Sequence, residues 1–203
     1  MAEINYQALV WLTYRLTASF AMGIPLAIFI WALIRKEAAI IRLLSIYWKN
    51  ASLMAISMLL FAGQSSIGFL SSFVSPFLMV GSVWFWTDLN EEIADFPPKR
   101  PLPLTLKIWR WSLSFWGICY TSIAINSIKC TQLNVGLACK SWLEAPVNLN
   151  KSLKTIFNFL FGANWSESLS AFIGYIGLIA FVIIFIQWLL THLPKQGRIA
   201  GDF

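Results

Sequence analysis

The charged residues that could carry chemistry are concentrated in one segment of the chain, residues 88–110. Four carboxylates fall within eight residues of it, namely Asp88, Glu91, Glu92 and Asp95. In a helix, Asp88, Glu92 and Asp95 would share one face, at i, i+4 and i+7. Carboxylates grouped in this way can hold Mg²⁺, which completes its coordination with substrate phosphates. Lys99 and Arg100 could then bind the phosphate oxygens. This pattern would suit a small membrane enzyme or carrier for an isoprenoid or lipid phosphate.

A structural interpretation accounts for the same residues with fewer requirements. Asp88 and Glu91 form a plausible capping pair, and acidic residues in a first turn offset the helix dipole. The basic residues beyond Pro98 could pair with the carboxylates or meet anionic lipid headgroups. We therefore expect no catalytic residues, no metal and no cofactor, and we lean against an enzyme. The six candidates for contact with a partner or ligand are Asp88, Glu91, Glu92, Asp95, Lys99 and Arg100.

The cysteines offer a second constellation. Eight residues separate Cys130 from Cys139, at the start of the long polar stretch 129–169. A disulfide here would close a small loop, and disulfides persist outside the cytosol. Free thiols are the alternative. A metal site would need two further ligands, which this stretch does not offer.

The elements that position these residues follow from the gaps between charges. A membrane-spanning helix needs about 20 apolar residues, and uncharged runs of this length predict spans near 16–34, 109–128 and 170–191. Residues 50–87 contain no charge, and one helix of that length would be about 57 Å long at about 1.5 Å per residue. We therefore predict two spans, 50–68 and 70–87, with a tight turn between them. One span plus a re-entrant segment is the alternative.

The distribution of basic residues favours five spans over four. With five, ten of the fifteen Lys and Arg residues lie on one side, whereas four spans divide them seven to eight. The positive-inside rule then places the C-terminus in the cytoplasm, and the N-terminus and the 129–169 loop in the lumen or periplasm. Within that loop, 151–161 combines two lysines with apolar residues, which suits a helix in the membrane interface.

Composition excludes a soluble domain. Hydrophobic residues are 58% and charged residues 12% of the 203 residues, whereas soluble domains carry about 25% charged residues. The prediction is an all-α, single-domain membrane helix bundle over residues 1–203. Its partners are the lipid bilayer and the subunits of a membrane complex. The basic residues collect on one side of a membrane, so nucleic acid is not an expected partner. Contact with lipid or pigment is left open.

Several motifs along the chain resemble those of an integral membrane family of cyanobacteria, the domain of unknown function DUF3177. They are YRL at 14–16, RLLSIYW at 42–48, IGFL at 67–70, WFWTDLNEEI at 84–93, WRW at 109–111, CKSWLE at 139–144 and KQGR at 195–198. The resemblance runs over nearly the whole chain. It implies a cyanobacterial thylakoid or plasma membrane, and it implies no activity. The function expected from residues and resemblance together is that of a non-enzymatic accessory or assembly factor of a photosynthetic membrane complex.

Overall fold

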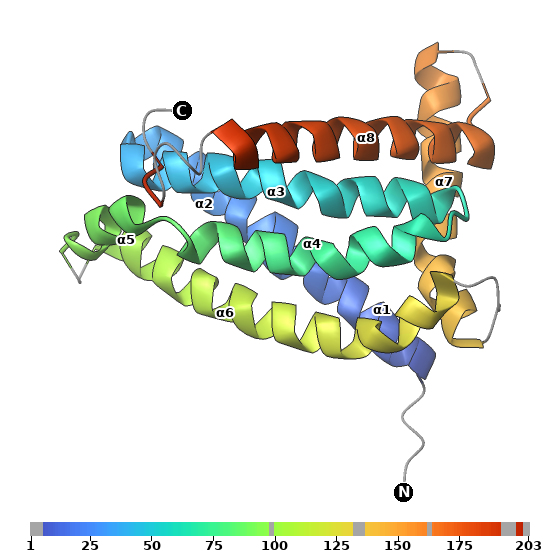
Figure 1. The fold of residues 1–203 in the computed structure, drawn as a ribbon, viewed down its shortest axis with the longest axis horizontal. Helices are drawn as coiled ribbons and strands as arrows, with labels where there is room; N and C mark the ends of the chain where they lie inside the picture. Colours follow the sequence, from blue (N-terminus) through green and yellow to red (C-terminus); the bar gives the residue numbers. More distant parts are fainter. Residues whose placement is uncertain (1–5, 98–99, 132–136, 162–163, 192–197, 201–203) are drawn as a thin grey trace, which may run out of the picture.

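Helices make up the regular structure of the computed structural model, which describes residues 6–97, 100–131, 137–161, 164–191 and 198–200. The described part of the chain contains no strand, and this confirms the all-α prediction. Most of the helices run side by side along one axis (Figure 1). In chain order they are α1 (Tyr6–Leu16), the π-helix η1 (Thr17–Gly23), α2 (Ile24–Arg35), α3 (Ala38–Ala62), α4 (Ile67–Trp84), α5 (Thr87–Ala94), α6 (Pro101–Ala124), the 3₁₀-helix η2 (Ile125–Thr131), α7 (Leu137–Phe161) and α8 (Glu167–Thr191).

The first pass along the bundle is one continuous helical stretch from α1 through η1 to α2. It contains the predicted span 16–34 and extends beyond it on the N-terminal side. It stops at Lys36, which adopts the left-handed conformation with φ 56° and donates its backbone N–H to carbonyls of the last turn. Helix α3 begins two residues later, so the connection between the predicted spans 16–34 and 50–68 is mostly helical and includes only a short turn.

Helices α3 and α4 form the hairpin predicted for residues 50–87. The chain reverses at Gly63–Ser66, where Gln64 has φ 55°. The turn therefore lies inside the predicted span 50–68 and not between residues 68 and 70. Both helices are long and apolar enough to cross a membrane, which supports two helices over a re-entrant segment. Helix α3 starts well before residue 50 because Leu43 and Tyr47 already pack into the core, while Arg42 pairs with α5. Charged residues therefore do not mark the end of this helix.

Among the described residues, four stretches meet the length and hydropathy expected of a membrane span: Tyr6–Arg35, Ala38–Ala62, Ile67–Trp84 and Glu167–Thr191. Helix α6 is 24 residues long and runs alongside them (Figure 1). Lys107 and Arg110 make its N-terminal half less apolar. It begins at Pro101, eight residues before the predicted span, because proline suits the first turn of a helix. These four stretches and α6 alternate in direction along the bundle (Figure 1). That all five cross the membrane stays a prediction.

Helix α7 crosses one end of the bundle at a steep angle to the other helices (Figure 1). It spans Leu137–Phe161, so the predicted outer loop 129–169 is largely helical, and the helix expected at 151–161 is only its last part. The first part is tied to α1: the Tyr14 hydroxyl donates to the Trp142 carbonyl at 2.7 Å, and the Gln7 amide donates to Glu144 at 2.6 Å. The last part exposes Phe159 beside Lys151 and Lys154, which is typical of a helix at a membrane surface.

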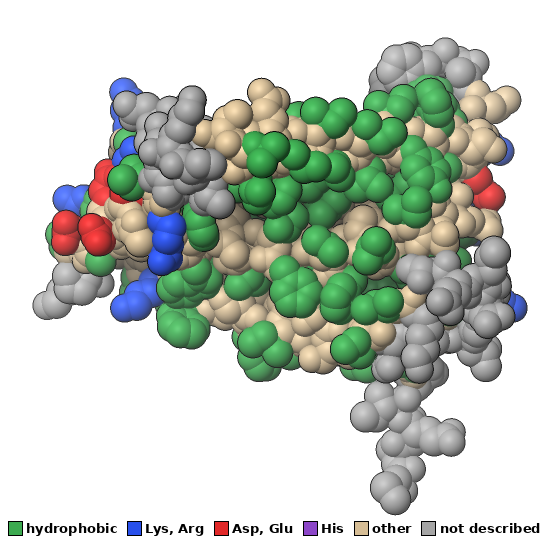
Figure 2. Space-filling view, viewed as in Figure 1, with side chains coloured by type: hydrophobic (Ala, Val, Ile, Leu, Met, Phe, Trp, Pro, Cys, Tyr) green, Lys and Arg blue, Asp and Glu red, His purple; other side chains and the backbone are tan. Residues whose placement is uncertain are grey.

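The surface of the bundle is divided into zones along its long axis. Figure 2 shows acidic and basic side chains at the two ends, while apolar side chains cover the middle of this face. Helix α8 exposes large apolar side chains along its length, among them Phe172, Ile183 and Leu190. An apolar middle between two charged ends matches a lipid environment. The chain is therefore a membrane protein.

Glycines allow α8 to approach α3 closely. A Cβ atom added to Gly63 would lie 2.6 Å from the backbone N and Cα atoms of Ala171, and one added to Gly174 would lie 2.9 Å from Leu60. Close contact lets the Ser170 hydroxyl donate to the Leu59 carbonyl at 2.9 Å. Small residues and hydroxyl groups are common in such contacts because helices in lipid associate by packing and hydrogen bonding.

The π-helix η1 exposes two backbone carbonyls to side chains from other helices. The Trp109 indole donates to the Phe20 carbonyl at 2.8 Å, and the Tyr47 hydroxyl donates to the Ala21 carbonyl at 2.6 Å. The two donors are almost fully buried, and their rings meet edge to face at 5.0 Å. In lipid, unpaired backbone groups are costly, so these contacts join the first pass to α3 and α6.

Candidate functional site

The acidic segment forms helix α5, directly after α4. Trp86 leaves the helical conformation between them, with φ −82° and ψ 113°, and α5 ends at Ala94, before Pro97. Leu89 is its one buried residue and anchors it to the core. The segment is therefore helical over Thr87–Ala94, and Asp95 lies just beyond the helix.

Asp88 binds the C-terminal segment of the chain. Both of its carboxylate oxygens accept the backbone N–H of Ala200, at 3.0 Å each. The Arg198 carbonyl accepts the backbone N–H of Thr87 at 3.1 Å, and the Arg198 guanidinium donates to the Phe85 carbonyl at 2.8 Å. Ala200 is buried as a result. The Asp88 carboxylate therefore holds the C-terminal segment at the corner between α4 and α5.

Glu92 and Arg100 bind the start of α3 instead. Glu92 forms an ion pair with Arg42, and Arg100 forms one with Glu37 at 3.4 Å between Nη1 and Oε1. The two pairs connect α5 and the beginning of α6 with the turn that follows α2. Because the side chains are partly exposed to solvent, each pair is worth at most about 1 kcal/mol. The Glu92–Arg42 pair fixes the position of α5, and the Arg100–Glu37 pair fixes that of the beginning of α6. Neither pair adds much to the stability of the fold.

Glu91 and Asp95 are exposed on the outer surface of α5 and its C-terminal end. Lys99 lies outside the described residues. In the described part of the chain no group of three or more His, Cys, Asp or Glu side chains could hold a metal ion. The candidates Asp88, Glu92 and Asp95 thus have three different surroundings: a backbone amide, an arginine and the surface. The carboxylates do not converge on a common point.

Cys130 and Cys139 form the predicted disulfide. Their Cα atoms are 5.8 Å apart, and both residues are buried. The bond joins η2 to the first turn of α7, close to Trp142, whose indole donates to the Tyr6 hydroxyl. It therefore fixes the beginning of the crosswise helix to the end of α6. Cys119, within α6, is a free cysteine of intermediate burial.

Thiol labelling should report on which side of the membrane α7 lies. In sealed vesicles, a Lys151→Cys variant on a Cys119→Ser background is expected to react with a membrane-impermeant maleimide only from the lumenal or periplasmic side. Lys151 is exposed on α7, so its accessibility does not depend on reducing the disulfide. The adduct can be measured by mass spectrometry. Reaction from the cytoplasmic side alone would contradict the predicted orientation.

Arg110 is an important residue that the sequence analysis placed only in a general basic group. Its side chain is buried, and Nη2 donates to the Val83 carbonyl at 2.6 Å and to the Asn90 amide oxygen at 2.5 Å. The guanidinium also lies over the Trp84 ring, 4.1 Å from its centroid. Arg110 therefore neutralises the carbonyl end of α4, where a positive charge is favourable, and holds α5 beside it.

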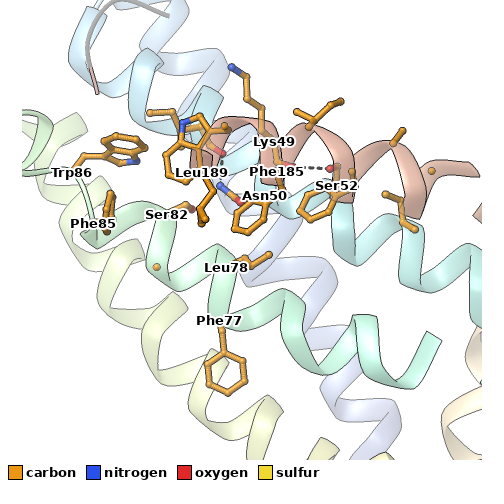
Figure 3. A pocket seen from close by; sticks show the side chains of 18 residues that line it. Lys49, Asn50, Ser52, Phe77, Leu78, Ser82, Phe85, Trp86, Phe185 and Leu189 are labelled. Atoms are coloured by element: carbon orange, nitrogen blue, oxygen red, sulfur yellow. Dashed lines mark hydrogen bonds between the residues drawn. The ribbon is translucent and has the colours of Figure 1, made fainter. Parts of the chain in front are cut away.

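A groove between α3, α4 and α8 is a second feature that the sequence analysis missed. It has a volume of about 770 Å³, comparable with ligand sites in proteins, which hold roughly 300–1,000 Å³. Its walls are mainly apolar, and Figure 3 shows Phe77 and Lys49 on opposite sides of it. Two glycines line the groove: Gly81 of α4, where an added Cβ atom would meet no atom within 4 Å, and Gly177 of α8, which packs on Ile56 of α3.

Helix lengths, the apolar zone and the charged ends define a polytopic helical membrane protein. Over residues 7–201 the chain matches the family described as "Protein of unknown function (DUF3177)". The chain belongs to this family, because the match covers nearly its whole length. No curated protein and no solved structure matches the chain.

Proposed function

We propose that the protein is a non-enzymatic accessory subunit of a membrane complex, and that it docks through the exposed acidic surface of α5. The observation that carries this proposal is how the acidic segment is used. Asp88 and Glu92 make contacts within the molecule that position α5 and the C-terminal segment, whereas Glu91 and Asp95 project from the outer surface. An enzyme acting on a lipid phosphate would need convergent carboxylates beside a cleft.

Two features favour a partner at this end of the molecule. Helix α5 is fixed by Arg42, Arg110 and the C-terminal segment, so Glu91 and Asp95 are held in defined positions. A rigid, charged surface suits a partner with a basic segment, because complementary charges steer association and fix its register. The photosynthetic identity of the complex rests on the resemblance to cyanobacterial proteins.

The test is the size of the particle that contains the full chain. After mild detergent solubilisation of native membranes, the tagged wild-type protein is expected to migrate with a larger complex on a native gel. The double variant Glu91→Lys, Asp95→Lys should migrate mainly as the separate protein. A photo-crosslinking residue at position 91 would identify the partner by mass spectrometry.

The control reverses two charges at the other end of the bundle. It is the double variant Lys151→Glu, Lys154→Glu. Both lysines are exposed on α7, so this variant should leave the complex intact. The proposal would be wrong if the wild-type chain migrated alone. It would also be wrong if the α5 variant stayed in the complex, or if both double variants left it equally.

A further inference from the structure

We propose that the corner between α4 and α5 is a binding site for a short peptide segment of a partner protein, with the pattern arginine, any residue, alanine. In the structure the chain's own residues Arg198–Ala200 occupy this corner site, at the end of the bundle that contains α5 (Figure 1). They therefore show which contacts the site makes with a peptide. The inference does not depend on the docking surface formed by Glu91 and Asp95.

The corner site is built from two helix ends and one side chain. Helix ends present backbone groups that have no partner within their own helix. Phe85 caps the C-terminal end of α4, and α5 begins at Thr87. Trp86 is extended between them and makes the chain turn. The site thus combines the Phe85 carbonyl, the Thr87 N–H and the Asp88 carboxylate.

The bound segment satisfies all three groups. Arg198 Nε donates to the Phe85 carbonyl at 2.8 Å, and the Thr87 N–H donates to the Arg198 carbonyl at 3.1 Å. The Ala200 N–H donates to both oxygens of Asp88, at 3.0 Å each. Two of these contacts involve only the backbone of the segment. A segment of another chain can make the same contacts, because main-chain hydrogen bonds are the common basis of peptide recognition.

Side chains at the first and third positions give the site its selectivity. The Arg198 guanidinium lies over the Phe85 ring, 5.4 Å from its centroid, and a cation is favoured at the carbonyl end of α4. Ala200 is 1% exposed and packs in the core, so a larger side chain would overfill this position. Ile199 is 55% exposed between them. The pattern that the site selects is therefore arginine, any residue, alanine.

The corner site should keep its shape when the segment leaves. Helix α5 is also held by the Glu92–Arg42 ion pair and by the hydrogen bond from Arg110 to Asn90. The segment itself lies at the surface, and parts of a protein with few buried contacts open more readily than its core. A partner segment with the same pattern can therefore take the place of the chain's own without unfolding the bundle.

The experiment follows the segment in the full-length protein with a spin label. An Ile199→Cys variant on a Cys119→Ser background is labelled with a nitroxide, and its mobility is measured by electron paramagnetic resonance. Ile199 suits the label because it is exposed and makes none of the hydrogen bonds of the corner site. The spectrum of this protein is expected to show an immobilised label.

Short peptides then test whether the site accepts the pattern from another chain. The peptide GRIAG, blocked at both ends, has the sequence of residues 197–201. Above the effective concentration of the tethered segment, which is in the millimolar range, it should shift most of the spectrum to a mobile component. GAIAG, which lacks the arginine, and GRILG, which has leucine in place of alanine, should leave the spectrum unchanged.

Two variants of the labelled protein test the contacts from each side. Asp88→Ala and Arg198→Ala should both make the label mobile without peptide, because each removes a contact of the segment. Arg35→Ala is the matched control, since Arg35 is an exposed arginine on α2, and its label should stay immobilised. Melting temperatures show whether the variants fold. If Asp88→Ala does not, the comparison of Arg198→Ala with Arg35→Ala still decides the question.

Several outcomes would overturn the proposal. These are a mobile label in the starting protein, an unchanged spectrum with GRIAG, equal effects of GRIAG and GAIAG, and equal effects of Arg198→Ala and Arg35→Ala. A particle mass of two chains that falls to one chain in Arg198→Ala would show that the segment binds a second copy. That result would also overturn the proposal, because the corner site would then join two identical chains.

Discussion

Replacing Arg110 with leucine is expected to lower the free energy of unfolding by about 3 kcal/mol or more. The substitution leaves the Val83 carbonyl and the Asn90 amide oxygen without their donor in the interior of the protein. Hydrogen bonds to a charged group contribute about 1.5–3 kcal/mol each. The loss can be measured from the midpoint of unfolding when the purified protein is titrated with a denaturing detergent.

Arg110→Lys is the informative control because it keeps the positive charge. Lysine lacks the planar guanidinium that stacks on Trp84 while its Nη2 atom donates to both acceptors. We therefore expect it to recover only part of the lost stability. If the lysine variant were as stable as the wild-type protein, charge alone would explain the role of Arg110. If the leucine variant were equally stable, the contacts of Arg110 would contribute nothing.

The second large effect is expected at the contact between α3 and α8. Gly63→Leu should destabilise the protein by about 3 kcal/mol or more, because overpacking costs about 1–3 kcal/mol and here the opposing atoms belong to the backbone of Ala171. If α8 moves away, the hydrogen bond between Ser170 and Leu59 is lost, as is the one between Ser65 and Tyr175 at 2.7 Å.

Gly81→Leu makes the same chemical change in a helix with open space beside it, and it should leave the melting temperature close to the wild-type value in lipid-free detergent. The two variants are compared by thermal unfolding followed by circular dichroism at one detergent concentration. Equal destabilisation of both would mean that leucine is poorly tolerated in these helices generally, and the argument from close packing would fail.

The sequence predicted the features that depend on local composition. The apolar runs predicted helices, the length of the uncharged run 50–87 predicted that the chain turns back within it, and the spacing of Cys130 and Cys139 predicted their disulfide. Gaps between charges were poor guides to helix ends, because a helix can continue beyond the membrane. Helix α3 does this, and Arg42 lies in the part that was expected to be a loop.

The contacts between distant residues could not be predicted from the sequence. Asp88 accepts the N–H of a residue 112 positions later, and the carbonyl that Trp109 binds belongs to a residue 89 positions earlier. Each depends on how whole helices pack, and no local pattern contains that information. The groove was missed for the same reason, since it needs Gly81 and Gly177 on two helices that both pack against a third.

The π-helix η1 also sets the rotation of α1 relative to α2. A π-turn accommodates one more residue than a regular turn, and each residue of an α-helix rotates its side chains by about 100°. Removing one residue from Thr17–Gly23 would restore regular α-helical geometry, but it would rotate α1 about the helix axis relative to α2. Tyr14 could then face Trp142 only if α2 gave up its contacts in the core. The extra residue therefore allows one helix to match two differently oriented neighbours.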